Sequence, residues 1–378
     1  MISCEKLWEI FEKQGLTYFA GVPDSTFKEW MSFLADNNGK ILTNRIAAIE
    51  RDAVGWAAGY HVSTGKIGVV YMQNSGLGNI VNPITSLTDL EVYNIPLVLM
   101  LGWRGEPGIK DEPQHKKMGR ITIPLLDILE INHGFLPDND KATAKFMAEV
   151  ISVIRKTGKP YAIIVRNGIL EEYKKSDNIV SQSVLEMARE EVIEIILDEM
   201  EGDEIIVSTT GKTSRELFEL REAKKQGHQR DFLMVGSMGL AASFGAEIAL
   251  QNFRKKVFIF DGDGSLIMSA GALSTIGFYG PENLYHIVFD NASYDSTGGQ
   301  PTTSPVVNFK QLALANNYKE AEIITTKKEL AMAIKEIRMK RGPHMLVVKA
   351  KGGARKDLGR PTINPIENKK AFMEFLLK

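Results

Sequence analysis

The chain carries a carboxylate and an amide whose types and spacing could bind a metal ion. Asp263 lies in the segment Gly262-Asp263-Gly264, and about 26 residues separate that segment from Asn291. Carboxylate and amide oxygens, together with backbone carbonyls, are hard ligands that suit Mg²⁺, which keeps other positions for a phosphate. The glycines let the backbone approach a bulky anion, and Ser265 begins a helix whose N-terminus attracts one.

A Gly-Asp-Gly segment alone is also explained by a tight turn hydrated by water, so the prediction depends on its neighbours. Val257–Phe260 and Tyr285–Phe289 have the length and apolar character of buried strands, and the residues from about Met268 to Tyr279 form an amphipathic pattern. Two strands joined by a helix are parallel, so both carboxyl ends open at one edge of the sheet, where α/β proteins bind ligands. Asp263 and Asn291 are therefore expected to meet there.

The same alternation of strand and helix runs through the chain and predicts an α/β protein. Its 378 residues suggest two domains, each with the pattern of a parallel sheet between two layers of helices. A polar run from Glu171 to Asn178 marks the boundary, which gives domains of 1–175 and 180–378. Further strands are predicted at Tyr18–Ala20, Lys40–Thr43, Ile67–Met72, Pro96–Leu101, Tyr161–Val165, Glu204–Val207, Ala321–Ile324 and His344–Val348. Further helices are predicted at Glu5–Lys13, Ser25–Leu34, Ile49–Tyr60, Ile80–Leu90, Ala142–Arg155, Ser214–Glu222, Leu240–Leu250, Phe309–Ala315, Lys328–Arg338 and from Glu367 onward.

Two segments interrupt this pattern. Gly102–Arg120 is predicted to be a long loop, and loops of that length are usually functional or disordered. Lys351–Thr362 is a basic, glycine-rich tail that is either a mobile flap or a surface loop.

Composition excludes several classes of function. A net charge of -1 and a pI near 6.6 provide no broad field for nucleic acid or an anionic membrane. The longest apolar runs, such as Pro96–Leu101, are too short to span a bilayer, and the N-terminus is acidic where a signal peptide would be basic. The single cysteine, Cys4, excludes an intrachain disulfide and a cysteine-based metal cluster. We therefore expect a cytoplasmic protein that binds neither nucleic acid nor a membrane.

Two glycine-containing motifs point elsewhere but are incomplete. Thr210-Gly211-Lys212-Thr213 is similar to the end of a P-loop, but that motif needs a glycine where Ile206 stands. Gly76-Leu77-Gly78 begins a dinucleotide fingerprint, but Val81 replaces its third glycine. Neither an NTPase nor a nicotinamide enzyme is favoured.

The spacing of Gly262-Asp263-Gly264 and Asn291 resembles the signature of thiamine-diphosphate enzymes. That resemblance implies that the side chains of Asp263 and Asn291 and the backbone carbonyl of Ser293 hold Mg²⁺ on the cofactor's diphosphate, with both glycines and Ser265 beside it. The family's usual Asn-Asn pair is Asp290-Asn291 here, so the first, non-ligating position is acidic.

Glu50 begins the helix of small residues AAIERDAVGWAAGYH, where its charge alone would be favourable at the N-terminus. In thiamine-diphosphate enzymes the N-terminal domain supplies one glutamate that hydrogen-bonds the aminopyrimidine ring and promotes its imino tautomer, and Glu50 matches that context. Gly236-Ser237-Met238-Gly239 is similar to the segment that holds the cofactor in its folded shape. There Met238 would prop the cofactor and Gly236 would accept a hydrogen bond from the pyrimidine amine, although ordinary core packing also explains Met238.

Four further segments resemble the phosphonopyruvate decarboxylases, with sulfopyruvate decarboxylases as close relatives. They are Gly21–Ser25, Gly105–Gly108 with Asp111–His115, Thr210–Phe218, and Lys356–Pro361. Larger 2-oxoacid decarboxylases carry a third domain between the pyrimidine-binding and diphosphate-binding domains, and this chain has room only for those two. The resemblance therefore implies the thiamine-diphosphate-binding fold without a middle domain. It also implies decarboxylation of 3-phosphonopyruvate, a 2-oxoacid, to phosphonoacetaldehyde and carbon dioxide.

Other functions stay open. The chain could be a sulfopyruvate decarboxylase, a carboligase of the acetolactate synthase type, or a non-catalytic partner subunit. The presence of both Glu50 and the Asp263/Asn291 pair argues against the last of these, because a degenerate subunit is free to lose one half.

The chemistry requires proton exchange and fixed positive charge. The intermediate left after carbon dioxide departs must be protonated, and Asp24 and His115 are the candidates for exchange near neutral pH, although a solvated loop histidine also explains His115. A dianionic phosphonate needs cations, which the two interrupting segments supply as Arg104, Lys110, Lys116, Arg120, Arg355, Lys356 and Arg360. The resemblance also implies a homodimer or higher homo-oligomer whose active sites are shared between chains.

Overall fold

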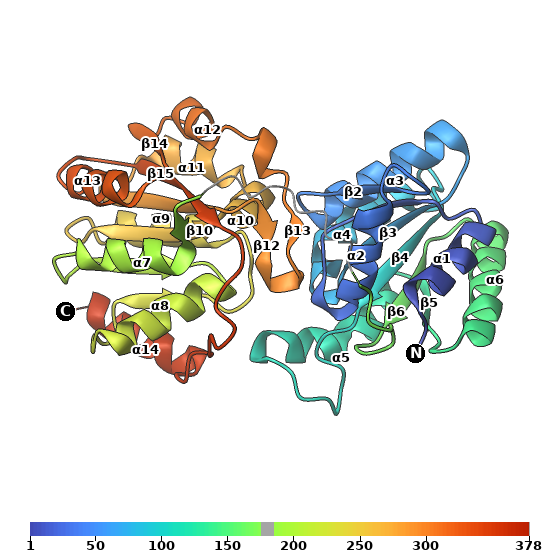
Figure 1. Cartoon of the computed structure of the whole chain (residues 1–378). Coiled ribbons are helices and arrows are strands. Elements are labelled where there is room, and N and C mark those ends of the chain that lie inside the picture. Colours follow the sequence, from blue (N-terminus) through green and yellow to red (C-terminus); the bar gives the residue numbers. More distant parts are fainter. Residues whose placement is uncertain (175–184, 378) are drawn as a thin grey trace. The chain divides into compact units, whose positions relative to one another are not determined.

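The computed structural model describes residues 1–174 and 185–377. The chain divides into two compact units, residues 1–178 and 179–378, and each contains a parallel sheet with helices on both faces (Figure 1). The predicted pair of three-layer α/β domains is thus confirmed. The predicted boundary in 171–178, with a second domain from 180, falls partly outside the described residues. None of the described helices has the length and apolar content needed to cross a bilayer.

The first unit is built on a parallel sheet with the strand order β2-β1-β3-β4-β6-β5. Its strands are β1 (Tyr18–Gly21), β2 (Thr43–Ile46), β3 (Gly68–Gln73), β4 (Leu97–Gly102), β5 (Asn132–Phe135) and β6 (Tyr161–Val165). One face is covered by α1 (Cys4–Lys13), α2 (Lys28–Asn37) and α6 (Asp140–Thr157), and the other by α3 (Glu50–Thr64), α4 (Leu77–Pro83) and α5 (Pro113–Ile128). The inner strands β1, β3, β4 and β6 are mostly apolar because their alternate side chains point to opposite helical layers, as Val69 and Val70 do, whereas β2 and β5 are more polar and more exposed.

The second unit repeats this architecture with the strand order β14-β15-β11-β10-β8-β9, and β7 pairs with β15. Its strands are β7 (Met187–Ala188), β8 (Ile205–Ser208), β9 (Asp231–Leu233), β10 (Val257–Gly262), β11 (Leu284–Asp290), β14 (Glu320–Ile324) and β15 (His344–Lys351). One face is covered by α7 (Arg189–Asp198), α8 (Lys212–Ala223) and α13 (Lys327–Ile337). The other is covered by α9 (Ala241–Gln251), α10 (Asp263–Met268), α11 (Ala272–Tyr279) and α12 (Phe309–Ala315), while α14 (Pro365–Leu376) packs against β9. A short antiparallel hairpin, β12 (Ser293–Tyr294) with β13 (Gln300–Pro301), follows β11.

The prediction of a loop over Gly102–Arg120 is wrong in its second half, because α5 begins at Pro113. Proline is favourable in the first turn of a helix, where its missing N–H is not needed. The first residues of α5 are mostly polar and Pro124 lies inside the helix, so the apolar periodicity that identifies a helix is weak here.

Other differences are smaller. The segment Gly262-Asp263-Gly264 is not a turn, because β10 continues through Gly262 and α10 begins at Asp263. The helix predicted over Ile80–Leu90 is α4 followed by a π-helical turn, Ile84–Thr88, and the one predicted from Ser25 begins as a 3₁₀ turn, Ser25–Phe27. The strand predicted at Lys40–Thr43 lies at Thr43–Ile46. The pattern also fails to predict β5, β7, β9 and α7, and the first three are too short or too polar to give a strand signal.

Candidate active site

The carboxyl ends of β10 and β11 bring the predicted metal ligands to one edge of the second sheet. The two strands are parallel neighbours, with Gly262 opposite Phe289, so Asp263 and Asn291 follow the ends of adjacent strands. Thr302 ties the two segments together. Its hydroxyl donates to Asp263 Oδ2 at 2.5 Å, and its backbone N–H donates to the carbonyl of Ala292 at 3.0 Å.

Asp263 has the electrostatic character of a cation ligand. Its side chain is 3% exposed, and burial, with a smaller contribution from nearby Asp290, raises its pKa to about 7 despite the hydrogen bond from Thr302. A buried carboxylate of this kind is stabilised by a bound cation. Among residues 1–174 and 185–377 no group of three or more His, Cys, Asp or Glu side chains is arranged to hold a metal. A cation here would therefore use the hard oxygens of one carboxylate, one amide and a carbonyl, a set that fits Mg²⁺.

Asp290, the acidic residue in the position where the resembled family has asparagine, is neutralised from β15. Its carboxylate pairs with the ammonium group of Lys349 and accepts a hydrogen bond from the hydroxyl of Ser304. The side chain is 2% exposed, so an unpaired charge there would be costly. These contacts occupy both oxygens of Asp290.

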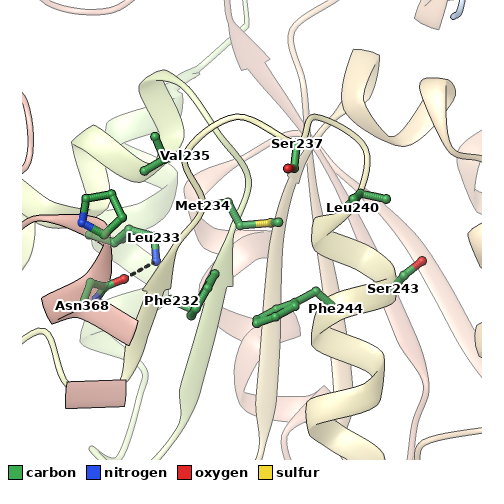
Figure 2. Close-up of a pocket in the computed structure, with 10 residues that line it drawn as sticks. Phe232, Leu233, Met234, Val235, Ser237, Leu240, Ser243, Phe244 and Asn368 are labelled. Atoms are coloured by element: carbon green, nitrogen blue, oxygen red, sulfur yellow. Dashed lines mark hydrogen bonds between the residues drawn. The ribbon is translucent and has the colours of Figure 1, made fainter. Parts of the chain in front are cut away.

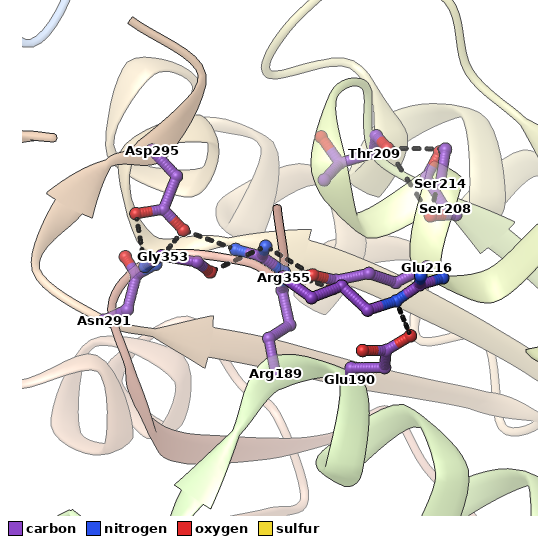
Figure 3. A network of polar contacts seen from close by, with 10 residues as sticks. All are labelled: Arg189, Glu190, Ser208, Thr209, Ser214, Glu216, Asn291, Asp295, Gly353 and Arg355. Carbon is purple, nitrogen blue, oxygen red and sulfur yellow. Dashed lines mark hydrogen bonds and ion pairs between the residues drawn. The ribbon is translucent and has the colours of Figure 1, made fainter. Parts of the chain in front are cut away.

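Asn291 is held by a buried polar network that the sequence does not reveal (Figure 3). Its Nδ2 donates to Asp295 Oδ2 at 2.9 Å, and its Oδ1 accepts from the backbone N–H of Ser293 at 3.0 Å. Arg189 of α7 joins Asp295 to Glu216 of α8 through hydrogen bonds of 2.7–2.8 Å. The partners are too far apart in sequence to form a motif, and only the position of Asp295 four residues after Asn291 could have suggested a link.

The predicted pyrimidine-binding segment, Gly236–Gly239, lies beside the residues that follow β8 and β10. Gly236 N–H donates to Thr210 Oγ1 at 2.9 Å, and Gly239 N–H donates to Ser265 Oγ at 3.1 Å. Its backbone is strained, because Ser237 has a left-handed φ of 49°, a conformation that residues other than glycine rarely adopt. Met238 is partly exposed rather than fully packed in the core.

A cavity of about 590 Å³ borders this segment (Figure 2). It is lined mainly by apolar side chains, among them Phe232, Met234, Val235, Leu240 and Phe244. Asn368 of α14 closes one side by pairing with the edge strand β9, accepting from Leu233 N–H at 3.0 Å and donating to Asp231 O at 2.8 Å. Ser237 lines the cavity, so the strained segment forms part of its wall.

In the first unit, Glu50 is a buried residue with a defined position. It is 6% exposed at the start of α3, and Asn79 Nδ2 donates to its Oε2 at 2.7 Å. Its carboxylate packs against Gly76, where an added Cβ would lie only 2.5 Å from Oε1. A charge that served only the helix N-terminus would need none of these contacts. The small residues of α3 lie in two different environments, since Ala53 and Ala57 are buried but Gly55 and Gly59 face open space.

Asp24 is fully buried at the carboxyl edge of the first sheet, where burial raises its pKa. Gln73, at the end of β3, donates from Nε2 to Asp24 Oδ1 at 2.9 Å. The other oxygen lies against Gly102, at the end of β4, where an added Cβ would come within 1.7 Å. Asp24 is thus a carboxyl group that keeps its proton to a higher pH than an exposed aspartate does.

His115 differs from the expectation that it titrates near neutral pH. Burial and then the charge of Arg104 lower its pKa to about 4, so its imidazole is neutral at pH 7. Arg104 itself is bound by Asp111, with distances of 2.8 and 2.5 Å from Nε and Nη2 to the carboxylate. Of the two proton-exchange candidates, only Asp24 has a pKa that is raised toward neutral pH, whereas the pKa of His115 is lowered away from it.

The predicted basic residues are not equivalent. Arg104 pairs with Asp111, and Arg355 pairs with Glu190, Glu219 and Asp357. The remaining candidates occupy exposed positions: Lys110, Lys116, Arg120, Lys356 and Arg360.

The segment after β15, which the sequence predicts to be a flap or a surface loop, is bound to α8. Arg215 donates to the carbonyls of Leu358 and Gly359, and Glu219 accepts from Gly359 N–H at 2.6 Å. Arg355 adds its ion pairs to Glu190 of α7 and Glu219 of α8. The segment is therefore anchored at several points along its length.

Comparisons with known proteins agree with this architecture. The family model of the thiamine pyrophosphate enzyme N-terminal TPP binding domain matches residues 4–123, and that of the C-terminal TPP binding domain matches residues 209–348. The chain is 35% identical to a phosphonopyruvate decarboxylase of Streptomyces viridochromogenes, over 96% of this chain and 92% of that protein. It is 33% identical to a phosphonopyruvate decarboxylase of Streptomyces hygroscopicus, over 99% and 94%. A sulfopyruvate decarboxylase of Methanosarcina acetivorans is 27% identical over 98% and 97%.

The two glycines around Asp263 should respond differently to alanine. A Cβ on Gly264 would lie 2.5 Å from the buried ring of Tyr294, whereas one on Gly262 would meet nothing within 4 Å. We expect Gly264→Ala to lower the free energy of unfolding by about 1–3 kcal/mol through overpacking, and Gly262→Ala to change it by less than about 0.5 kcal/mol. Urea denaturation of both variants measures this, and equal effects would contradict the packing described for Gly264.

Proposed function

The chain belongs to the phosphonopyruvate decarboxylase family of thiamine pyrophosphate enzymes, and we propose that it converts 3-phosphonopyruvate to phosphonoacetaldehyde and carbon dioxide. The observation that carries this proposal is identity of 33–35% to two phosphonopyruvate decarboxylases along nearly the whole chain. The presence of both Glu50 and the Asp263/Asn291 pair supports a catalytic role. They belong to different halves of the chain, and a non-catalytic subunit would be free to lose one of them.

We propose that the second unit holds thiamine diphosphate and Mg²⁺. Asp263, Asn291 and the carbonyl of Ser293 would bind the metal, and Gly262, Gly264 and Ser265 would lie beside the diphosphate. Gly236 and Met238 would contact the pyrimidine ring. The bound cofactor would supply a carbanion nucleophile and an electron sink for the bond broken when carbon dioxide leaves.

In the first unit, Glu50 and Asp24 would be the groups that transfer protons. The carboxylate of Glu50 is held by Asn79 and Gly76 in one place, as a group that exchanges a proton with the aminopyrimidine must be. Asp24 is a buried acid whose pKa is raised, which suits it to hold a proton and deliver it to the reacting carbon. Gln73 fixes one oxygen of Asp24. His115 is neutral and would act as a hydrogen-bonding partner rather than as an imidazolium acid.

The phosphonate would be bound by cations that are not already committed to intrachain carboxylates. Arg104 and Arg355 are each paired with aspartate or glutamate, so the exposed Lys110, Lys116 and Arg120 near the start of α5 are better placed to bind a new anion. Sulfopyruvate is the second candidate substrate, favoured by the similarity to the Methanosarcina acetivorans sulfopyruvate decarboxylase.

We also propose that a second copy of the chain completes each active site. The exposed face of α3 supports this, because Trp56 is 55% exposed and a Cβ added at Gly55 or Gly59 would meet nothing within 4 Å. Such a surface can accept another helix at close range. Glu50 would then serve a cofactor held by its partner chain.

Substrate choice tests the main proposal. We expect carbon dioxide release from 3-phosphonopyruvate that requires both thiamine diphosphate and Mg²⁺. We expect kcat/KM for pyruvate to be lower by roughly 10³-fold, about 4 kcal/mol, because pyruvate lacks the phosphonate that would form charge-assisted hydrogen bonds with these cations. A coupled assay with phosphonopyruvate, sulfopyruvate and pyruvate measures this. Faster turnover of sulfopyruvate would establish the second candidate, and equal turnover of phosphonopyruvate and pyruvate would refute a phosphonate site.

Glu50→Gln should keep the fold and most of the cofactor affinity, because the amide oxygen can still accept from Asn79. The rate of proton exchange at the thiazolium carbon should fall by about 10²–10⁴-fold, since an amide cannot exchange the proton. Exchange followed by NMR reports the step without substrate. The control is Asp52→Asn, an exposed change in the same helical turn, which should retain the wild-type rate. A wild-type exchange rate in Glu50→Gln would contradict the role assigned to Glu50.

Shared sites predict complementation between two inactive variants. A mixed dimer of Glu50→Ala and Asp263→Ala chains has one site with both lesions and one site with neither. With random mixing about half of the dimers are mixed, so activity should recover to roughly a quarter of wild type. The assay follows mild dissociation and reassociation, with each variant alone as control. If chain exchange is demonstrated and activity stays absent, each site lies within one chain.

A further inference from the structure

A hydrogen-bonded network of side chains connects Asn291 to Glu216 in the second unit, through Asp295 and Arg189 (Figure 3). The side chains of Arg189, Glu216 and Asp295 are only 6%, 2% and 7% exposed. Burying charged groups is costly unless each is paired and hydrogen-bonded. Each of these three charged groups has such a partner, so the network has a specific geometry and is not a set of surface ion pairs.

The network decides which way the amide of Asn291 faces. An ionised carboxylate can only accept hydrogen bonds, so the contact with Asp295 Oδ2 must be made by Asn291 Nδ2, at 2.9 Å. Asn291 Oδ1 then points to the opposite side, where it accepts from Ser293 N–H at 3.0 Å. An amide oxygen has two lone pairs, and one of them is left for a cation. An amide turned by 180° would present N–H groups, which cannot bind a metal.

Asp295 is itself prevented from turning. Its Oδ2 also accepts from Arg189 Nη1 at 2.8 Å, and its Oδ1 accepts from Gly353 N–H at 2.9 Å. Arg189 is fixed on its other side by a two-pronged contact with Glu216, with Nε–Oε2 and Nη2–Oε1 distances of 2.7 and 2.8 Å. Because a planar guanidinium matches a carboxylate in this geometry, it has little freedom to rotate.

We propose that Asp295 is a positioning residue that holds the amide oxygen of Asn291 toward the cation, with Arg189 and Glu216 as its support. This inference rests on the proposed function, since it requires a metal at Asn291. A network that served only to anchor the segment after β15 through Gly353 would have no effect on metal affinity, and this difference can be measured.

The test is calorimetric titration of Mg²⁺ into the full-length protein in excess thiamine diphosphate, below the melting temperature of each variant. Asp295→Ala should weaken Mg²⁺ binding by about 10–100-fold, the usual effect of losing a group that orients a metal ligand. Asp295→Asn should recover part of this loss. Its amide oxygen, in the place of Oδ2, can still accept from Asn291 Nδ2 and Arg189 Nη1. Recovery is only partial because its NH₂ group cannot accept the hydrogen bond from Gly353 N–H.

Asp231→Ala is the matched control. Asp231 forms a buried two-pronged pair with Arg221 in the same unit, at 2.9 and 2.8 Å, and both residues are at most 1% exposed. Asp231→Ala should lower the melting temperature but leave the Mg²⁺ affinity of the folded protein unchanged. An equal loss of affinity in Asp231→Ala would show that general destabilisation is the cause and would overturn the proposal.

The remaining outcomes separate this inference from the function on which it rests. A wild-type protein that binds no Mg²⁺ with thiamine diphosphate would overturn both. A wild-type protein that binds Mg²⁺, together with an Asp295→Ala variant of equal affinity, would overturn only the role of Asp295. If Asp295→Ala does not fold, Asp295→Asn decides alone, with a several-fold weaker affinity expected and wild-type affinity contradicting the proposal.

Discussion

The parallel pairing of β10 with β11 is the constraint on which the candidate site depends. With Gly262 opposite Phe289, the residues that follow the two strands emerge at one edge of the sheet, although a helical connection separates them in sequence. A shift in this register would separate the carboxylate of Asp263 from the amide of Asn291. The strands are buried on both faces by helices, which makes such a shift costly, and Thr302 fastens the two ends together.

Charge balance around this edge distinguishes Asp263 from its neighbours. Asp290 is paired with Lys349, and Asp295 and Glu216 are paired with Arg189. In the described part of the chain, the side-chain contact of Asp263 is with Thr302, a neutral hydroxyl, and its pKa rises to about 7. The fold thus neutralises the carboxylates of Asp290, Asp295 and Glu216 internally, whereas a bound cation would balance the charge of Asp263.

In the first unit, Glu50 and Asp24 are buried in a different way. Glu50 lies against Gly76 and Asp24 lies against Gly102, and in both places a Cβ would overlap the carboxylate. The absence of a side chain on each glycine provides the space in which the acid is buried. An amide then fixes one oxygen of each acid, Asn79 for Glu50 and Gln73 for Asp24. Burial without a cationic partner favours the protonated form of an acid, as the raised pKa of Asp24 illustrates.

The sequence by itself determined the α/β class, the two parallel sheets and the meeting of the segments after β10 and β11. Those features depend on local periodicity and on the topology of a single strand-helix-strand unit, which neighbouring residues encode. Tertiary structure alone decided that Pro113–Ile128 is a helix, that the segment after β15 is bound to α8, and that the pKa of His115 is about 4. It also decided that Arg189 reaches Asp295, 106 positions away in the chain. Contacts between such distant residues depend on how helices pack against the sheet and on which charges are buried together, and no local pattern records either.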